Sequence, residues 1–270
     1  MGGMKRFIPF MKSDPVVAVV RMSGVIQASS RGGGGISDAT FAPLLEKAFR
    51  KGKPKALAIV LNSPGGSPVQ SSLVAARIKR LSKETEVPVS VFVEDVAASG
   101  GYWIACASDE ILVDPASIVG SIGVISASFG FDKFIEKHGV ERRVHTAGKS
   151  KSFMDPFKPE GPEDIKRLKA IQDPMHQIFI DHVKASRGEK LKEGTDHFTG
   201  DVWLGQQAID EGIVDGIGHL VPTMKERYGD KVKFAVYGPK RGIFQRFGSS
   251  IASEVLGSAE ERFEFSKFGL

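Results

Sequence analysis

Apolar runs alternate with segments of helical spacing in the N-terminal part of the chain. Residues 16–21, 56–61 and 87–93 are continuous and largely β-branched, which is typical of strands covered on both faces. Between them, apolar residues recur every three or four positions and predict two helices: Phe41, Leu44, Leu45 and Phe49, then Leu73, Ala76, Ile78 and Leu81. The alternation predicts an α/β fold with a mainly parallel sheet, because parallel strands need crossover connections.

Shorter apolar runs and one long amphipathic segment continue this pattern. They predict strands at residues 111–113, 119–125 and 143–145, and helices at residues 162–186 and 204–211. We expect three parts: a basic and aromatic extension (1–12), one globular domain (13–238) and an amphipathic extension (239–270). The last part has the pattern of a segment that docks on the domain, pairs with another subunit or lies on a lipid surface.

Composition excludes several classes of protein. The chain has 270 residues, of which 41% are hydrophobic, and this is enough to bury a sizeable core. Its one cysteine, Cys106, excludes a disulfide scaffold and a thiolate-rich metal site. The net charge of +5 comes without a block of lysines and arginines, so we expect no nucleic-acid partner.

The sequence shows neither a secretion signal nor a membrane span. Residues 1–12 lack an apolar core of signal-peptide length, and no apolar run reaches the roughly 18 residues of a spanning helix. We therefore expect a cytoplasmic protein. Phenylalanines next to basic residues at both ends predict peripheral contact with the inner membrane face: Phe7, Phe10, Phe244 and Phe247.

Three glycine-containing turns follow or interrupt the predicted strands, at residues 62–67, 97–101 and 119–123. Loops at the carboxyl ends of parallel strands form the binding crevice of an open α/β sheet. Glycines let backbone N–H groups approach a ligand closely, as in an oxyanion hole. Tight turns alone also use glycine, so each turn by itself has two interpretations.

Ser99 is the best candidate nucleophile, because small neighbours leave its hydroxyl accessible at the start of a predicted helix. The alternative is that Ser99 only caps that helix. The six histidines lie in segments that mostly read as surface, so a lysine is the better candidate base. Residues 148–154 supply Lys149 and Lys151, although a lysine in such a loop is more often a solvated charge.

Taken together, these segments resemble the signal peptide peptidase A family of serine proteases over roughly residues 16–220. The resemblance lies in four segments in the same order: Leu61-Asn62-Ser63-Pro64-Gly65-Gly66-Ser67, Ala97-Ala98-Ser99-Gly100-Gly101, Gly148-Lys149-Ser150-Lys151, and residues 205–215. It implies a Clp protease/crotonase-like fold, in which the chain spirals through ββα units with a mainly parallel sheet.

The resemblance also implies a role for each matching residue. Ser99 becomes the nucleophile and Lys151, rather than Lys149, the general base. Gly66 and Gly100 supply the N–H groups of the oxyanion hole, with Gly65 as the less favoured choice. Ser121 matches a serine that orients the lysine amine.

The function expected from this resemblance is that of a serine endopeptidase that works through an acyl-enzyme, without a metal or another cofactor. The expected substrates are remnant signal peptides or other short hydrophobic peptides, and the expected assembly is a homo-oligomer. Two alternatives share the fold. One is a crotonase-type acyl-CoA hydratase or isomerase that uses Glu94 or Asp95, and the other is a catalytically inactive scaffold.

Overall fold

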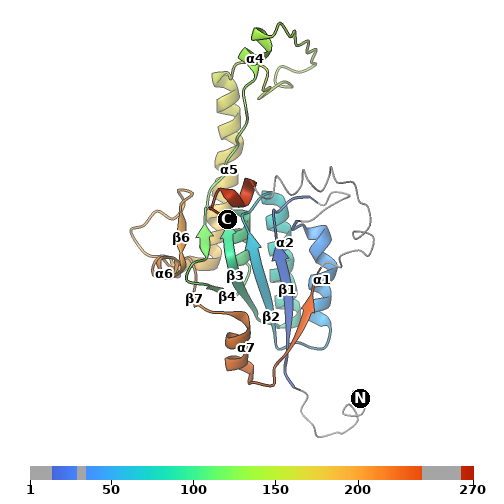
Figure 1. Cartoon of the computed structure of the whole chain (residues 1–270), viewed down its shortest axis with the longest axis vertical. Helices are drawn as coiled ribbons and strands as arrows, with labels where there is room; N and C mark the ends of the chain where they lie inside the picture. Colours follow the sequence, from blue (N-terminus) through green and yellow to red (C-terminus); the bar gives the residue numbers. More distant parts are fainter. Residues whose placement is uncertain (1–13, 29–34, 239–262) are drawn as a thin grey trace. The chain divides into compact units, whose positions relative to one another are not determined.

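The computed structural model describes residues 14–28, 35–238 and 263–270 (Figure 1). The chain divides into two compact units. The larger unit comprises Met1–Ile122 and His182–Leu270, and the smaller unit comprises Gly123–Asp181. The predicted boundaries at residues 12 and 238 adjoin segments outside the described residues, so the three-part division stays a prediction.

An eight-stranded sheet forms the centre of the larger unit. Its main path runs β6-β5-β3-β2-β1-β8, while β4 pairs with β3 and β7. Every pairing is parallel except that of β6 with β5, so the predicted α/β class and mainly parallel sheet are confirmed. The strands are β1 (Val16–Ser23), β2 (Ala56–Ser63), β3 (Val89–Ala98), β4 (Glu110–Val113), β5 (Ile118–Gly120), β6 (Val202–Leu204), β7 (Gly216–Ile217) and β8 (Lys233–Tyr237).

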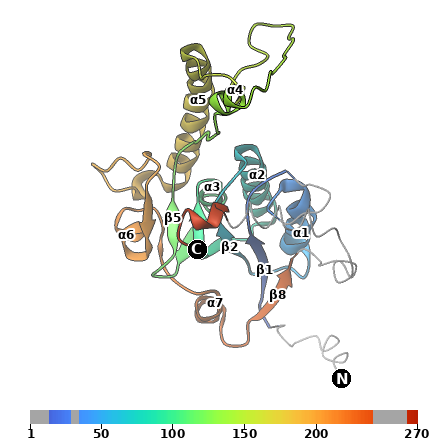
Figure 2. The ribbon, with the colours of Figure 1, turned by 45° about the horizontal axis from the view of Figure 1, so that its top comes forward.

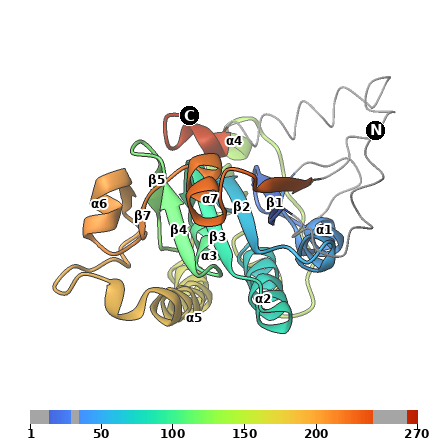
Figure 3. The same ribbon diagram turned by 90° about the horizontal axis from the view of Figure 1, so that it is seen from below.

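Helices cover both faces of this sheet (Figure 3). Helices α1 (Asp38–Arg50) and α2 (Pro68–Thr85) lie on one face, and α7 (Leu220–Tyr228) lies on the other. Met224 of α7 packs into a buried cluster with Val17, Val19, Ala58 and other residues of the sheet. Successive side chains of a strand point to opposite faces, so the residues between them face α1 and α2. This two-sided burial explains the continuous apolar runs in β1 and β2.

Several elements differ from the sequence prediction. Strand β8 extends the sheet beyond β1 (Figure 2) and was not predicted. The strand expected at residues 119–125 ends at Gly120, because Ser121 has a positive φ of 52° that no regular strand accepts. The strand expected at residues 143–145 is absent, and all three residues are exposed. On α2 the prediction holds only for the C-terminal half of the expected apolar face: Ile78 and Leu81 are buried, but Leu73 and Ala76 are exposed. Val74 and Ala75 are buried in their place.

Strand β3 changes partners along its length. Residues 90–93 pair with β4, and residues 96–98 pair with β5. On its other edge, β3 pairs with β2 in one register up to Val93 and in a shifted register at Ala97. The strand leads directly into the short helix α3 (Gly100–Ala105), so the irregular part of β3 carries Ser99 to the carboxyl edge of the sheet.

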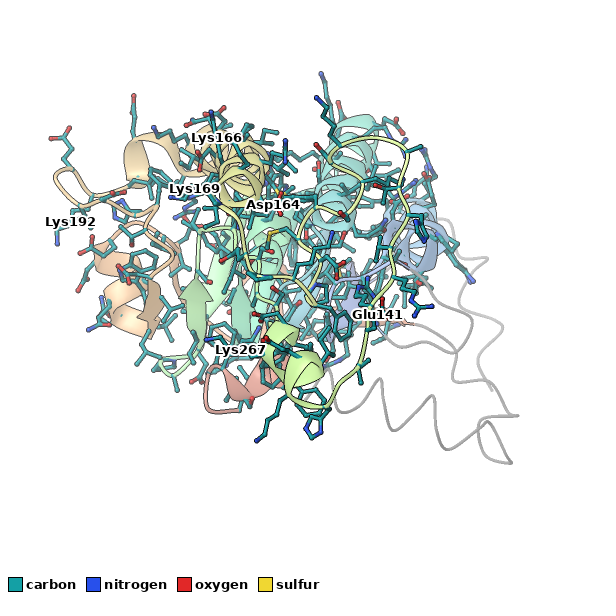
Figure 4. The ribbon with its side chains drawn as sticks, turned by 90° about the horizontal axis from the view of Figure 1, so that it is seen from above. Glu141, Asp164, Lys166, Lys169, Lys192 and Lys267 are labelled. Atoms are coloured by element: carbon teal, nitrogen blue, oxygen red, sulfur yellow. The ribbon has the colours of Figure 1, made fainter. Side chains whose placement is uncertain are left out.

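The smaller unit is exposed over most of its length. It contains α4 (Asp132–Lys137) and most of α5 (Pro162–Arg187). Glu141 lies on the loop after α4, and Lys166 and Lys169 project from α5 (Figure 4). Among residues 123–181, only Phe179 is buried.

Two further short elements belong to the larger unit. They are a single turn of 3₁₀ helix (Gly188–Lys190) and α6 (Gly205–Asp210), whose observed span lies within the helix predicted at residues 204–211. Within the part of the chain that the structure describes, no helix is both long enough and apolar enough to cross a membrane.

Candidate active site

Ser99 occupies a strained backbone position between β3 and α3. Its φ is +51° and its ψ is −120°, a combination that is rare for a residue with a side chain. The Ser99 N–H donates to Gly120 O at 2.8 Å, and Ser99 O accepts the Trp103 N–H at 3.0 Å. The side chain makes no capping hydrogen bond to α3. Ser99 therefore precedes the helix without capping it, which removes the alternative interpretation of this serine.

The loop after β2 presents the N–H group of Gly66. Ile26 donates its N–H to Gly65 O and accepts the Ser67 N–H, both at 2.7 Å, as in a parallel bridge. Gly66 lies between these two contacts, so its own N–H points away from Ile26. The Gly65 N–H donates to Ser63 Oγ at 3.3 Å. Of the two glycines, Gly66 is thus the one with an uncommitted N–H among the described residues.

This loop approaches the Ser99 turn so closely that only glycine fits. A Cβ atom on Gly65 would lie 2.8 Å from Ser99 Cβ and 2.9 Å from Gly100 N. A Cβ atom on Gly100 would lie 3.4 Å from Gly66 N. Gly100 is also the first residue of α3, where a backbone N–H has no acceptor within the helix. The N–H groups of Gly66 and Gly100 are therefore neighbours beside Ser99.

Ser121 lies next to Ser99 through the pairing of β3 with β5. Ala98 pairs with Gly120, so the residues that follow them leave the sheet side by side. Ser121 is held at its φ of 52° by a hydrogen bond from its N–H to Asp201 O at 2.7 Å. The larger unit thus brings together four of the five predicted site residues: Ser99, Gly66, Gly100 and Ser121.

Lys151 lies in the smaller unit, on a loop whose two ends are tied together. Arg142 Nε donates to Asp155 Oδ2 at 3.0 Å, and the Arg142 guanidinium lies 4.8 Å from the ring centre of Phe157. The hydrogen bond from the Phe157 N–H is the main cause that lowers the pKa of Asp155 below its ordinary value, and the hydrogen bond from Arg142 adds to it. Lys149 and Lys151 are both exposed on this loop. Ser99 and Lys151 thus belong to different units of the chain.

A buried polar cluster behind α3, which the sequence did not reveal, anchors the helix that follows Ser99. Tyr102 Oη donates to Ile213 O at 2.7 Å. Arg187, only 3% exposed, donates to Gly212 O at 2.9 Å and to Asp215 Oδ2 at 2.8 Å. Burial opposes the charge on Asp215, but hydrogen bonds from Arg187 and Lys190 outweigh it and hold the pKa of Asp215 below its ordinary value.

His182 is the histidine attached to α3, and its environment makes it a poor base. Its ring stacks on Trp103 with 4.9 Å between ring centres, and its Nε2 lies 2.9 Å from Trp103 O. Because a carbonyl oxygen only accepts, Nε2 is the protonated nitrogen. Burial lowers the pKa of His182 to about 4. The ring is therefore neutral at pH 7 and committed to Trp103. The sequence predicted that the histidines lie mostly at the surface, whereas His182 is half-buried and His197 is buried.

A strained serine beside two free N–H groups, at the carboxyl edge of a parallel sheet, is the arrangement of hydrolases that use a serine nucleophile. Comparison with known proteins agrees with this class. The chain belongs to peptidase family S49, whose family model matches residues 82–231. This confirms the resemblance to the signal peptide peptidase A proteases.

Individual relatives differ in how much of their length the chain matches. It is 45% identical to the Na(+)/H(+) antiporter NhaA of Brucella melitensis over 100% of this chain, but over only 39% of that protein. It is 33% identical to the putative protease slr0021 of Synechocystis over 68% of this chain and 67% of that protein. Most of the Brucella protein lies outside the match, so its transport function is not transferred to this chain.

Among solved structures, the chain is similar to a mutant of the 1510-N membrane-bound stomatin-specific protease in complex with a substrate peptide. The identity is 14%, the match covers 92% of this chain and 99% of that chain, and the TM-score is 0.49.

Replacing Gly65 by alanine tests the close approach of the loop to Ser99. The added Cβ atom lies 2.8 Å from Ser99 Cβ, so the loop must move and the N–H pair separates. We expect the rate at which a fluorophosphonate labels Ser99 to fall about 100-fold or more. Gly194→Ala is the control, because Gly194 also has a positive φ (+83°) but nothing lies within 4 Å of its Cβ position. Equal labelling of both variants would contradict the geometry.

Asp215→Asn tests the buried cluster through its pH dependence. The pKa of the Asp215 carboxyl is lowered on folding. Such a group stabilises the protein at pH values above its pKa in the unfolded chain, and this contribution is lost as the pH falls through its pKa in the folded protein. We expect the variant to lose about 3 kcal/mol in free energy of unfolding at pH 7, and the difference from wild type to shrink below about pH 4. Urea unfolding between pH 3 and pH 7 measures both values. The control is Asp210→Asn on the exposed face of α6, and a loss at Asp215 that stays constant over this range would argue against the cluster.

Proposed function

We propose that this chain is a serine endopeptidase that hydrolyses peptide bonds through a Ser99/Lys151 dyad. The observation that carries the proposal is the position of Ser99, at a φ of +51° beside the N–H groups of Gly66 and Gly100. Membership of peptidase family S49 supports the same reaction class. In this proposal Gly66 and Gly100 form the oxyanion hole, and Ser121 orients the Lys151 amine.

The reaction follows from where charge develops. The neutral amine of Lys151 takes the proton of Ser99 Oγ as that oxygen attacks the peptide carbonyl. The N–H groups of Gly66 and Gly100 hold the resulting oxyanion, and Lys151 then gives its proton to the leaving amine. A water molecule, deprotonated by the same amine, attacks the acyl-enzyme. The ester bond to Ser99 Oγ then breaks, Lys151 returns the proton to that oxygen, and the second product leaves as a carboxylic acid. Each step moves a proton between groups of this chain, the substrate and water.

Short hydrophobic peptides, such as remnant signal peptides, are the substrates that we propose. The turn around Ser99 is built from Ala97, Ala98, Gly100 and Gly101, so an extended peptide with small or apolar side chains meets little obstruction there. Peripheral contact with the inner membrane face fits such substrates and stays a prediction, as does a cytoplasmic location. The four terminal phenylalanines that suggested this contact lie outside the described residues.

The crotonase alternative needs a carboxylate that is free to act on a substrate. Glu94 is paired with Arg21 at 2.9 Å, and Asp95 accepts a hydrogen bond from Asn62 at 2.5 Å. Both carboxylates thus have partners in other strands of the sheet, whereas the Ser99 hydroxyl does not cap its helix. These contacts favour the protease over the acyl-CoA enzyme.

We further propose that the chain forms homo-oligomers through its smaller unit. Only one residue of this unit is buried, and large apolar side chains of α4, α5 and the loops beside them are exposed. Exposed apolar surface of this kind is typical of an interface. The exposed residues include Ile125, Phe129, Phe134, Val140, Ile171 and Ile178.

Single alanine substitutions test the dyad. We expect Ser99→Ala to abolish cleavage of a fluorogenic peptide, and Lys151→Ala to lower kcat about 1,000-fold or more, because each removes a group that acts in every turnover. Lys149→Ala is the matched control, since it removes a lysine from the same loop. Circular dichroism confirms that each variant is folded. Wild-type turnover by Lys151→Ala, or equal losses for the two lysine variants, would exclude Lys151 as the base.

Phe134→Glu tests self-association. Phe134 is 60% exposed on α4, and a buried, unpaired carboxylate at an interface is costly. We expect sedimentation velocity to show a lower mass for this variant than for the wild type. Val221→Glu on α7 is the control, because Val221 is 47% exposed in the larger unit. A monomeric wild type, or an unchanged mass for Phe134→Glu, would contradict an interface at α4.

A further inference from the structure

We propose that Asn62 is a positioning residue, which fixes the shifted register between β2 and β3 and thereby places Ser99 against the glycine loop. This inference rests on the proposed role of Ser99. Asn62 does not touch the reacting atoms in this account, because it acts through the backbone of β3.

The register shift leaves one residue of β2 facing three residues of β3. Leu61 pairs with Val93 and Ser63 pairs with Ala97. Asn62 alone therefore lies opposite Glu94, Asp95 and Val96. A bulge of this kind interrupts the ladder of backbone hydrogen bonds and leaves polar groups that need other partners.

The Asn62 amide is the partner of one of these backbone groups and of one side chain of the bulge. Its Oδ1 accepts the Val96 N–H at 3.2 Å, and its Nδ2 donates to Asp95 Oδ2 at 2.5 Å. Asparagine is the short side chain that offers both an acceptor and a donor, and here each faces a matching group. Asn62 therefore ties two adjacent residues of the bulge to β2.

Ser117 completes the bulge from the opposite side of β3. It is 1% exposed, and its Oγ donates to Glu94 O at 2.5 Å. It lies immediately before β5, the strand with which β3 pairs after the bulge. The bulge therefore lies where β3 stops pairing with β4 and begins to pair with β5.

The register after the bulge leaves no freedom around Ser99. A Cβ atom on Gly101 would lie 2.5 Å from Ser63 O, and one on Gly65 would lie 2.8 Å from Ser99 Cβ. A slip of one residue that moved Tyr102 into the place of Gly101 would set a large side chain against Ser63 O. Correct placement of Ser99 beside the Gly66 N–H therefore depends on the bulge, and the bulge depends on Asn62.

An exchange of donor and acceptor tests this dependence. Asn62→Asp keeps the acceptor for the Val96 N–H but sets a second carboxylate against Asp95. We expect kcat to fall about 10- to 100-fold, with KM changed less than about threefold, because a small displacement of a reacting group lowers the rate more than binding. In the double variant Asn62→Asp/Asp95→Asn, the new amide at position 95 donates to the new carboxylate, and we expect kcat within about threefold of wild type.

Gln206→Asp is the matched control. The Gln206 amide also donates to a carboxylate, Asp210, at 2.9 Å, but on α6 and away from the bulge. We expect its kcat to equal that of the wild type. Wild-type kcat in Asn62→Asp, or a folded double variant that is as slow as Asn62→Asp, would overturn the inference. If Asn62→Asp does not fold, Asn62→Ala removes both contacts without adding a charge. Its kcat is then compared with those of the wild type and of Gln206→Asp, and a wild-type kcat in Asn62→Ala would overturn the inference.

Amide hydrogen exchange separates this inference from the proposed function. The Ser99 N–H donates to Gly120 O at 2.8 Å, so its exchange rate reports the pairing just beyond the bulge. We expect faster exchange at Ser99 in Asn62→Asp and recovery in the double variant. Unchanged exchange in Asn62→Asp would contradict the positioning role even in an active enzyme. Absence of protease activity in the wild type would instead contradict the proposed function, while the exchange rates would still decide the role of Asn62.

Discussion

The close approach of two backbone segments governs the candidate site. Residues 63–66 lie at the end of β2, and residues 99–101 follow β3. A Cβ atom on any of their four glycines would fall within 3 Å of an atom of the other segment, of Ile26 or of Ser71. Such an approach requires glycine at fixed positions and a register that cannot slip. It brings two otherwise ordinary N–H groups, those of Gly66 and Gly100, close to each other beside Ser99.

The rest of the larger unit keeps this approach rigid. Helices on both faces bury β1 to β3, and the polar cluster of Tyr102, Arg187 and Asp215 holds α3 from behind. Polar groups buried in this way are stable only when each has a partner, and no buried side-chain nitrogen or oxygen among the described residues lacks one. The strain at Ser99 is therefore supported by a surrounding structure with little freedom to relax it.

The sequence predicts the parts of this structure that depend on local pattern. Continuous apolar runs predicted β1, β2 and β3, because both faces of these strands are buried. Strand β8 gave no such run, since it lies at the sheet edge and Val236 is 64% exposed. The extent of β5 was overestimated because its end is set by a contact between Ser121 and Asp201, which the local pattern does not contain.

The same distinction applies to the site. Glycines and small residues around Ser99 made it a candidate, and the fold brings Ser99, Gly66, Gly100 and Ser121 together. The contacts of Asn62 and Tyr102 were missed because each joins residues far apart in the chain, such as Tyr102 and Ile213, which are 111 positions apart.

A crystal structure of the protein after reaction with a fluorophosphonate tests the central claim most directly. We expect phosphorus bonded to Ser99 Oγ, one phosphonyl oxygen within about 3 Å of both Gly66 N and Gly100 N, and Lys151 Nζ within hydrogen-bond reach of Ser99 Oγ. An adduct on another residue, or a phosphonyl oxygen turned away from both N–H groups, would contradict it.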